Sequence, residues 1–567
     1  MHTRTLPSQR SAFRNERVLF RLSRTCLTLF FSSLLLASGC TRFGFDRVGD
    51  ELHPTPDLTQ LDARFDGAVA DSTLVTSETN ADAITPVDST LDSSAPTPDS
   101  TLDSIIVTPD TTLDLIIVTP DTTLDLIIVT PDTTLDSSTT PFEQWSVRLG
   151  SNLSDEGVAV DVDKNRNIAL TGHFYNTVDF GGGPLTSDGR HDVFVASFDG
   201  KGVHRWSRSF GGTYTDWGMG VVIDDSGNTT VTGKVMVTVD FGAGPDVGPI
   251  LRSDGFVASY GPTGLYRWSR RLISAAGDAV FGNDITTDGE NVYFVGDFEN
   301  AVDFGAGALM SIGGRDSIMV KYDSEGVHLL SKQSGALGSI VNCNGLAVDS
   351  AGNITFAGEF SGTVDFGGGP LTSAGTGDVY VASYAPSGAH RWSRRFGGTL
   401  LDYATAVAAD PSGNVTVTGR FRETVDFGDS SPVTAVAGSP DCFVVSYDVN
   451  GAYRWSRHFG GALYDNSMAV AADQNGDVTV TGYFQDSADL GGGVLTSAGL
   501  EDVFVARYDS SGAHLWSKRF GAAESDVGQG VAVDGSGNVT LTGYFEETVD
   551  FGFGPLTSAG AFDVFLV

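Results

Sequence analysis

The sequence predicts an all-β fold, a seven-bladed β-propeller of four-stranded blades, and three recurring features predict it. The first is an aromatic or aliphatic residue followed by Ser, at Trp145, Trp206, Trp268, Leu330, Trp392, Trp455 and Trp516. The second is Val-Asp-Phe-Gly or a near variant, at Asp179, Asp240, Asp303, Asp365, Asp426, Asp489 and Asp550. Both features recur every 61–63 residues. The third is Asp-Val-Phe-Val-Ala or a near copy, at Asp192, Asp378 and Asp502.

One repeat shows why each unit is built of strands. Ala389–Phe396, Thr405–Ala409 and Val415–Phe421 are short runs of Val, Thr, Ala and aromatic residues, which are typical of strands. Asp410–Asn414 contains Pro, Ser, Gly and Asn, which permit a tight reversal. A fourth strand follows from the Asp-Val-Phe-Val-Ala segment. The Val-Asp-Phe-Gly element recurs in every copy, so we expect a turn role for its Asp and burial between blades for its Phe.

The two ends of the repeat region predict closure of the ring. The region begins with a lone Trp-type strand, Phe142–Gly150, and stops at Asp563–Val567, where the next Trp-type strand is due. Pairing of these two segments would complete the seventh blade and leave no exposed edge. The alternative is a chain that ends at this point by chance.

Residues 1–39 have the pattern of a secretory signal. Arg residues precede the apolar run Leu27–Ala37, which is too short to span a bilayer as a helix. The final Ala37-Ser-Gly-Cys40 resembles the lipobox of bacterial lipoproteins, although Leu is commoner than Ala at its first position. The resemblance implies lipidation of Cys40 and, because Thr41 replaces the Asp linked to inner-membrane retention, an outer-membrane or cell-surface location. The alternative is ordinary cleavage and release of the protein.

Residues 40–141 are rich in Asp, Thr, Ser and Pro and lack Lys. A segment of this composition buries too little apolar surface to offset its ordering entropy, so we expect a disordered linker. The 11-residue unit Thr108–Val118 is repeated without change at Thr119–Val129. Regular Pro and Asp favour a stiff, self-repelling stalk between a membrane anchor and the propeller at 142–567.

Charge and cysteine content restrict the function classes. The chain has 34 Lys+Arg and 71 Asp+Glu, a net charge of −37, which disfavours nucleic acid as a partner and favours cations or basic partners. Cys343 and Cys442 lie in neighbouring repeats of the predicted propeller. They form either a disulfide, which an extracytoplasmic compartment permits, or two buried thiols.

The repeat resembles a known family, the bacterial β-propeller repeat called SBBP. The residues that carry the resemblance are Ala532–Phe545, AVDGSGNVTLTGYF, and their counterparts such as Ala347–Phe360. The resemblance covers about three quarters of the chain. It implies a propeller fold and an envelope or extracellular setting, and it implies no agreed activity and no catalytic residues.

Five loops that lead into a predicted innermost strand carry an Asp in the same place. In a propeller these loops surround the central axis on one face, where ligands often bind. A ring of carboxylates there could hold Ca²⁺ through oxygen ligands or attract a cationic partner. Alternatively, each Asp caps its own loop by accepting backbone N–H groups. The five residues are Asp155, Asp216, Asp402, Asp465 and Asp526.

Catalytic motifs are not found in the sequence: it has no His-Glu-x-x-His, Gly-x-Ser-x-Gly or phosphate loop. Trp217 breaks the repeat beside Asp216 on the predicted ligand face. An indole there either stacks on a sugar or anchors a partner, or it is partly buried against a neighbouring loop.

These patterns predict a lipid-anchored propeller that serves in binding, recognition or adhesion at the bacterial surface, with an unidentified protein or glycan ligand. One alternative is a secreted or envelope hydrolase of glycans or peptides, with its site in the divergent loops of the third and fourth blades. The other alternative is a purely structural envelope protein. The fold alone does not decide between these classes.

Overall fold

The computed structural model describes residues 144–247, 253–274 and 279–567. Within them, seven four-stranded antiparallel sheets surround one axis, which confirms the predicted seven-bladed propeller. The signal segment, Cys40 and the linker lie outside the described residues. None of the helices among the described residues is long and apolar enough to cross a membrane.

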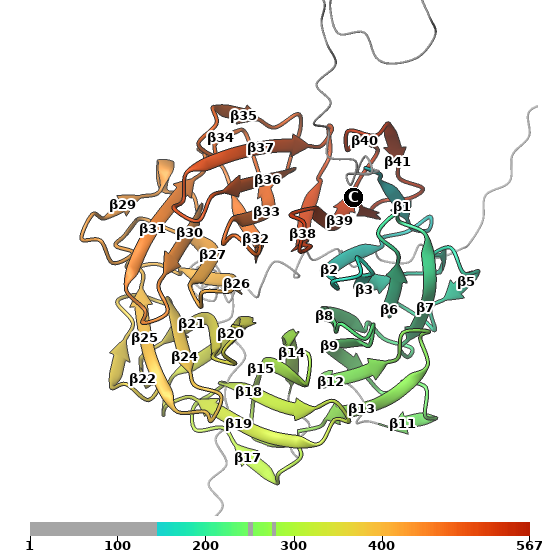
Figure 1. The fold of residues 1–567 in the computed structure, drawn as a ribbon, viewed down its shortest axis with the longest axis horizontal. Coiled ribbons are helices and arrows are strands. Elements are labelled where there is room, and N and C mark those ends of the chain that lie inside the picture. The colour runs from blue at the N-terminus through green and yellow to red at the C-terminus, as the bar shows by residue number, and fades with distance from the viewer. Residues whose placement is uncertain (1–143, 248–252, 275–278) are drawn as a thin grey trace, which may run out of the picture. The chain divides into compact units, whose positions relative to one another are not determined.

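Each blade runs from an innermost strand to an outermost strand (Figure 1). The innermost strands are β2 (Glu156–Val162), β8 (Trp217–Ile223), β14 (Val280–Thr287), β20 (Ile340–Val348), β26 (Tyr403–Ala409), β32 (Asn466–Ala472) and β38 (Val527–Val533). The second strands are β3 (Ile168–Phe174), β9 (Thr229–Met236), β15 (Asn291–Phe298), β21 (Ile354–Ser361), β27 (Val415–Phe421), β33 (Val478–Phe484) and β39 (Val539–Phe545).

The outer half of each blade is also regular. The third strands are β6 (Asp192–Phe198), β12 (Ser253–Tyr260), β18 (Asp316–Asp323), β24 (Asp378–Tyr384), β30 (Asp441–Tyr447), β36 (Asp502–Tyr508) and β42 (Asp563–Leu566). The outermost strands are β7 (His204–Phe210), β13 (Tyr266–Leu272), β19 (His328–Ser334), β25 (His390–Phe396), β31 (Tyr453–Phe459), β37 (His514–Phe520) and, for the seventh blade, β1 (Val147–Leu149).

The ring closes as predicted. Strand β1 pairs antiparallel with β42, with Val147 opposite Leu566 and Leu149 opposite Val564. The first described strand therefore supplies the outermost strand of the seventh blade, and the indole N–H of Trp145 reaches the first blade, where it donates to the Gly200 carbonyl oxygen at 3.1 Å.

A short hairpin between the second and third strands of every blade was not predicted. The hairpins are β4–β5 (Thr177–Asp179, Pro184–Thr186), β10–β11 (Thr238–Asp240, Pro245–Val247), β16–β17 (Ala301–Asp303, Ala308–Met310), β22–β23 (Thr363–Asp365, Pro370–Thr372), β28–β29 (Thr424–Val425, Val433–Thr434), β34–β35 (Ser487–Asp489, Val494–Thr496) and β40–β41 (Thr548–Asp550, Pro555–Thr557). Their first strands are the Val-Asp-Phe-Gly elements. Asp179 caps the turn by accepting the Gly181 and Gly183 N–H groups at 2.7 and 3.0 Å. The 3₁₀ turn η1 (Val436–Gly438) follows β29.

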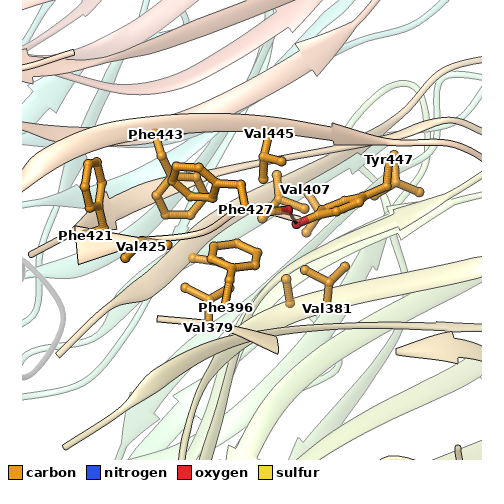
Figure 2. Packing of buried hydrophobic residues seen from close by; sticks show 14 of the residues in the cluster. Val379, Val381, Phe396, Val407, Phe421, Val425, Phe427, Phe443, Val445 and Tyr447 are labelled. Atoms are coloured by element: carbon orange, nitrogen blue, oxygen red, sulfur yellow. Dashed lines mark hydrogen bonds between the residues drawn. The ribbon is translucent and has the colours of Figure 1, made fainter. Parts of the chain in front are cut away.

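The hydrophobic core lies between blades. Figure 2 shows Phe427, from the fifth-blade copy of Val-Asp-Phe-Gly, beside Phe443 of its own blade and Phe396 of the fourth blade. The ring centroid of Phe427 is 5.3 Å from that of Phe443 and 5.2 Å from that of Phe396. This confirms the predicted burial of the Phe between blades. Cys343 and Cys442 are free and buried, so they behave as small apolar side chains.

Candidate functional site

The two rims of the propeller differ in sequence. We call the rim where the innermost strands begin the entry rim, and the rim where they end the exit rim. At the exit rim the same Asp-centred turn recurs: Asp410 accepts the N–H groups of Ser412 and Asn414 at 2.8 and 2.9 Å, and Asp163 and Asp534 make the same contacts. At the entry rim the loop aspartates recur, but the side chains at the start of the innermost strands and at the end of the second strands change from blade to blade.

The changing side chains form a ring, which we call the variable ring. One set follows the Gly near the end of each second strand: His173, Lys234, Asp297, Glu359, Arg420, Tyr483 and Tyr544. Opposite them in the strand register, on the innermost strands, are Glu156, Trp217, Phe281, Asn342, Tyr403, Asn466 and Val527. Several members, including His173, Tyr403 and Asn466, are buried. Residues needed only for folding can be the same in every blade, so this variation marks the entry rim as the candidate ligand site.

The first two blades contribute an aromatic and cationic group. The half-buried Trp217 ring is stacked with His173, at 5.4 Å between centroids and 17° between planes. The Nζ atom of Lys234 lies 3.6 Å from the centroid of the same indole. Burial, with His191 and Lys234 nearby, holds the pKa of His173 well below its usual value. Trp217 is thus partly buried against side chains of neighbouring strands, and its role as a ligand-binding residue stays a prediction.

The third and fourth blades contribute buried carboxyl groups. Asp297 accepts from Asn283 Nδ2 at 2.7 Å and lies 3.5 Å from Arg315. Both oxygens of Glu359 accept amide N–H groups, from Asn342 at 2.5 Å and Asn344 at 2.9 Å. Burial raises the pKa of Asp297 to about 6 and also raises the pKa of Glu359. These carboxyl groups are hydrogen-bonded, which favours a structural role over proton transfer.

The fifth and sixth blades contribute a guanidinium between aromatic rings. Arg420 Cζ lies 4.2 Å from the ring centroid of Tyr403 and 4.6 Å from that of Tyr464. Tyr464 is in turn stacked with Tyr483 at 6.5 Å and 8°. The Arg420 side chain therefore lies at the junction of the two blades.

The five predicted loop aspartates lie at the entry rim, and each is buried in its own loop. Each carboxylate accepts two backbone N–H groups, one from its loop and one from the end of the adjoining second strand. For Asp216 these come from Gly212 at 2.7 Å and Met236 at 2.5 Å. In the described ranges no three His, Cys, Asp or Glu residues gather closely enough to hold a metal ion. The Ca²⁺ ring stays a prediction, and these contacts favour the turn-cap alternative.

Each loop aspartate also lies near the first Asp of a third strand in the preceding blade, a proximity that the sequence did not reveal. Burial is the main cause that raises the pKa of Asp155 and Asp402 to about 6 and of Asp216, Asp465 and Asp526 to about 7. In each case the neighbouring carboxylate adds to the increase. The pairs are Asp155 with Asp563, Asp402 with Asp378, Asp216 with Asp192, Asp465 with Asp441, and Asp526 with Asp502.

Sequence reasoning missed the variable ring, although a signal was present. Every repeat contains a Gly between Thr, Val or Ala and one residue that differs, as in Thr-Gly-His173-Phe and Thr-Gly-Arg420-Phe. Trp217 and the five aspartates were found because they stand out individually. The variable ring is found only when the repeats are aligned and the positions whose residue type changes are noted.

Comparisons with known proteins found distant similarities. No family model matches the chain. An uncharacterised WD repeat-containing protein of Acanthamoeba polyphaga mimivirus is 21% identical over 71% of this chain and 36% of its own length. The regulatory protein FlaEY of Caulobacter vibrioides is 29% identical over 31% of this chain and 19% of its own length. The chain therefore spans about a third or less of each of these relatives.

Two of the solved structures similar to this chain are described as propeller domains, and both are similar at low identity. The WD40 propeller domain of Doa1 has 10% identity and a TM-score of 0.36, covering 74% of this chain and 95% of its own. The propeller domain of the Trilobed protease of Pyrococcus furiosus has 9% identity and a TM-score of 0.36, covering 73% and 96%.

Proposed function

We propose that this chain is a lipid-anchored β-propeller that recognises a ligand at the bacterial cell surface with its entry rim. The observation that supports the proposal is the variable ring, which places different charged and aromatic side chains on one face of an otherwise repetitive ring. The resemblance to SBBP repeats and the lipobox-like Ala37-Ser-Gly-Cys40 support the surface location.

The binding function is tested by changing exposed apolar residues on one rim at a time. Purified protein is screened on glycan and peptide arrays, and its ligands are then measured with two variants. The entry-rim variant changes Leu153, Tyr214, Leu400 and Leu463 to Ser; the control variant changes Val203, Leu265 and Val327 to Ser on the exit rim. All seven side chains are exposed, by 36–66%.

We expect the entry-rim variant to lose at least about tenfold in affinity, because apolar contact area is removed from the interface, while the exit-rim variant stays within about twofold. The reverse pattern would overturn the proposal. Arrays without any ligand would also overturn it and favour a structural envelope protein.

Lipidation is tested at Cys40. In a bacterial host fed an alkyne-bearing palmitate analogue, we expect the wild-type protein to take up the label and to sediment with the outer membrane. Cys40→Ala should abolish both, whereas Cys26→Ala, inside the predicted signal, should leave both unchanged. Label that persists in Cys40→Ala, or that is missing from the wild type, would show that Cys40 is not the anchor.

A hydrolase remains the second candidate, because two buried carboxyl groups, Asp297 and Glu359, lie on the same rim, even though their amide hydrogen bonds favour a structural role. Turnover of an array ligand that Glu359→Gln abolishes would favour the hydrolase. Turnover that survives this change would exclude Glu359 from the chemistry.

A further inference from the structure

Arg420 is a buried cation without a carboxylate partner. The residue as a whole is 7% exposed. Among the residues that the structure describes, none of the ion pairs involves Arg420. The chain has 71 acidic residues, so the lack of a carboxylate partner at Arg420 does not reflect a shortage of carboxylates.

Other buried arginines of the propeller are paired. Arg271 lies 2.9 Å from Asp254, and Arg507 forms an ion pair with Asp473. A guanidinium that is removed from water without a counter-charge is costly, because it loses hydration and gains no ion pair in return. At Arg420 two tyrosine rings take the place of a carboxylate, so the guanidinium keeps its capacity to pair with an anion.

The two tyrosine rings fix how an anion approaches. Tyr403 and Tyr464 contact the guanidinium, with their ring centroids 4.2 and 4.6 Å from Cζ. A cation–π contact leaves the N–H groups of a guanidinium available to donate hydrogen bonds. The edge of the guanidinium presents parallel N–H donors that match the two oxygens of a carboxylate. Arg422 is close enough to influence the pKa of Tyr403 and adds a second positive charge.

The surroundings favour a single negative charge over a polyanion. Glu359 also influences Tyr403, so a carboxyl group lies near the site, and the whole chain carries a net charge of −37. A phosphate dianion or an acidic polymer would be repelled more strongly than one carboxylate.

The two loops that lead to the tyrosines each carry an exposed leucine. Leu463 directly precedes Tyr464 and is 51% exposed, and Leu400, in the loop that leads to Tyr403, is 36% exposed. We propose that Arg420 binds the C-terminal carboxylate of a peptide whose last side chain is aliphatic, with Tyr403 and Tyr464 holding the guanidinium and the two leucines contacting that side chain. This inference rests on the proposed binding function and names the ligand class of one part of the entry rim.

Calorimetry with small probes tests the inference. The full chain is titrated with the tripeptide acetyl-Ala-Ala-Leu, with the same tripeptide as its C-terminal amide, with glucuronic acid and with inorganic phosphate. We expect saturable binding of the free acid and at least tenfold weaker binding of the amide, because the amide cannot accept two N–H donors with a negative charge. Equal binding of acid and amide, or tighter binding of glucuronic acid or phosphate, would overturn the peptide assignment.

Variants identify the residue. Arg420→Gln and Arg420→Lys should each weaken binding of the free acid at least tenfold, since Lys keeps the charge but lacks the planar fork. Arg457→Gln removes an exposed arginine and should leave binding unchanged. Thermal melting shows whether Arg420→Gln is folded, and Tyr464→Leu, which keeps Arg420 but removes one clamping ring, should also weaken binding. Unchanged binding in Arg420→Lys and Tyr464→Leu would overturn the proposal.

The outcome separates this inference from the proposed function. If array ligands depend on the entry rim while the tripeptide acid does not bind, the carboxylate subsite is wrong and the recognition function stands. If neither binds, both fail.

Discussion

A chain that starts at residue 151 should unfold far more easily than one that starts at residue 142. Removing β1 uncovers the edge of β42 and leaves the seventh blade with three strands. It also deletes Leu149, which is buried against the first blade, and the Arg148 guanidinium, which lies 2.5 Å from the buried carboxylate of Asp563. Loss of one buried apolar side chain and of the partner of a buried charge together costs about 5 kcal/mol or more.

The measurement is thermal and urea unfolding of 142–567 beside 151–567. We expect the midpoint of the shorter chain to be lower by at least about 5 °C, and a synthetic peptide of residues 142–150 to restore part of the loss by pairing with β42. Midpoints that agree within about 2 °C would show that β1 does not hold the ring closed.

The fold was predictable because its determinants repeat. Seven copies of the same strands and turns, at one spacing, define four-stranded blades, and the lone strand at Phe142–Gly150 predicts closure. The hairpins such as β4–β5 were missed because each strand has only two or three residues. A strand that short shows no alternation of apolar and polar residues from which it could be predicted. The turn stabilises it instead, here through the hydrogen bonds from the Gly181 and Gly183 N–H groups to Asp179.

The candidate site was less predictable because function in a repeat protein depends on what differs. The loop aspartates recur, so the sequence drew attention to them, and the structure shows backbone donors at both oxygens of residues such as Asp216. Arg420 is one of several arginines in the sequence. Its interest comes from Tyr464, a residue 44 positions away that only the packing of the sixth blade against the fifth brings beside it.

We expect the stability of the propeller to fall as the pH rises from about 5 to about 7. The loop aspartates and several third-strand aspartates have folded pKa values of about 6 or 7, against 3.8 as the ordinary value, mainly because burial disfavours their charged form. A carboxyl group with a higher pKa in the folded chain binds its proton more tightly there. Its contribution is therefore most favourable below the unfolded value and is lost as the pH rises through the folded value.

Five histidines have the opposite effect, because burial lowers the pKa of each in the folded chain. They therefore reduce the stability of the fold at pH values below their ordinary pKa of 6.5. These residues are His173, His191, His204, His390 and His458. The buried carboxyl groups are more numerous, so we expect the free energy of unfolding to be greatest near pH 5. Urea unfolding at pH 5, 6, 7 and 8 measures it. A free energy of unfolding that rises from pH 5 to 8 would contradict the assignment of raised pKa values.

The first blade offers a direct test of the cause. The first Asp of the third strand is paired with an arginine of the outermost strand in four blades, through Arg148, Arg271, Arg395 and Arg519. In the first blade Ser209 occupies that register position, opposite Phe194. Asp192 then has no arginine beside it among the described residues, and its Oδ2 accepts only the backbone N–H of Asp188, at 3.1 Å. Burial raises the pKa of Asp192 to about 6.

Ser209→Arg should restore the missing pair. The new guanidinium would lower the pKa of Asp192, so we expect a gain of about 1.5–3 kcal/mol in the free energy of unfolding at pH 7, and a smaller gain at pH 5, where Asp192 is mostly protonated. Ser226→Arg, at an exposed turn of the exit rim, is the matched control because it adds the same charge without a buried partner. Equal gains in both variants, or equal gains at both pH values, would show that net charge rather than the Asp192 pair sets the stability.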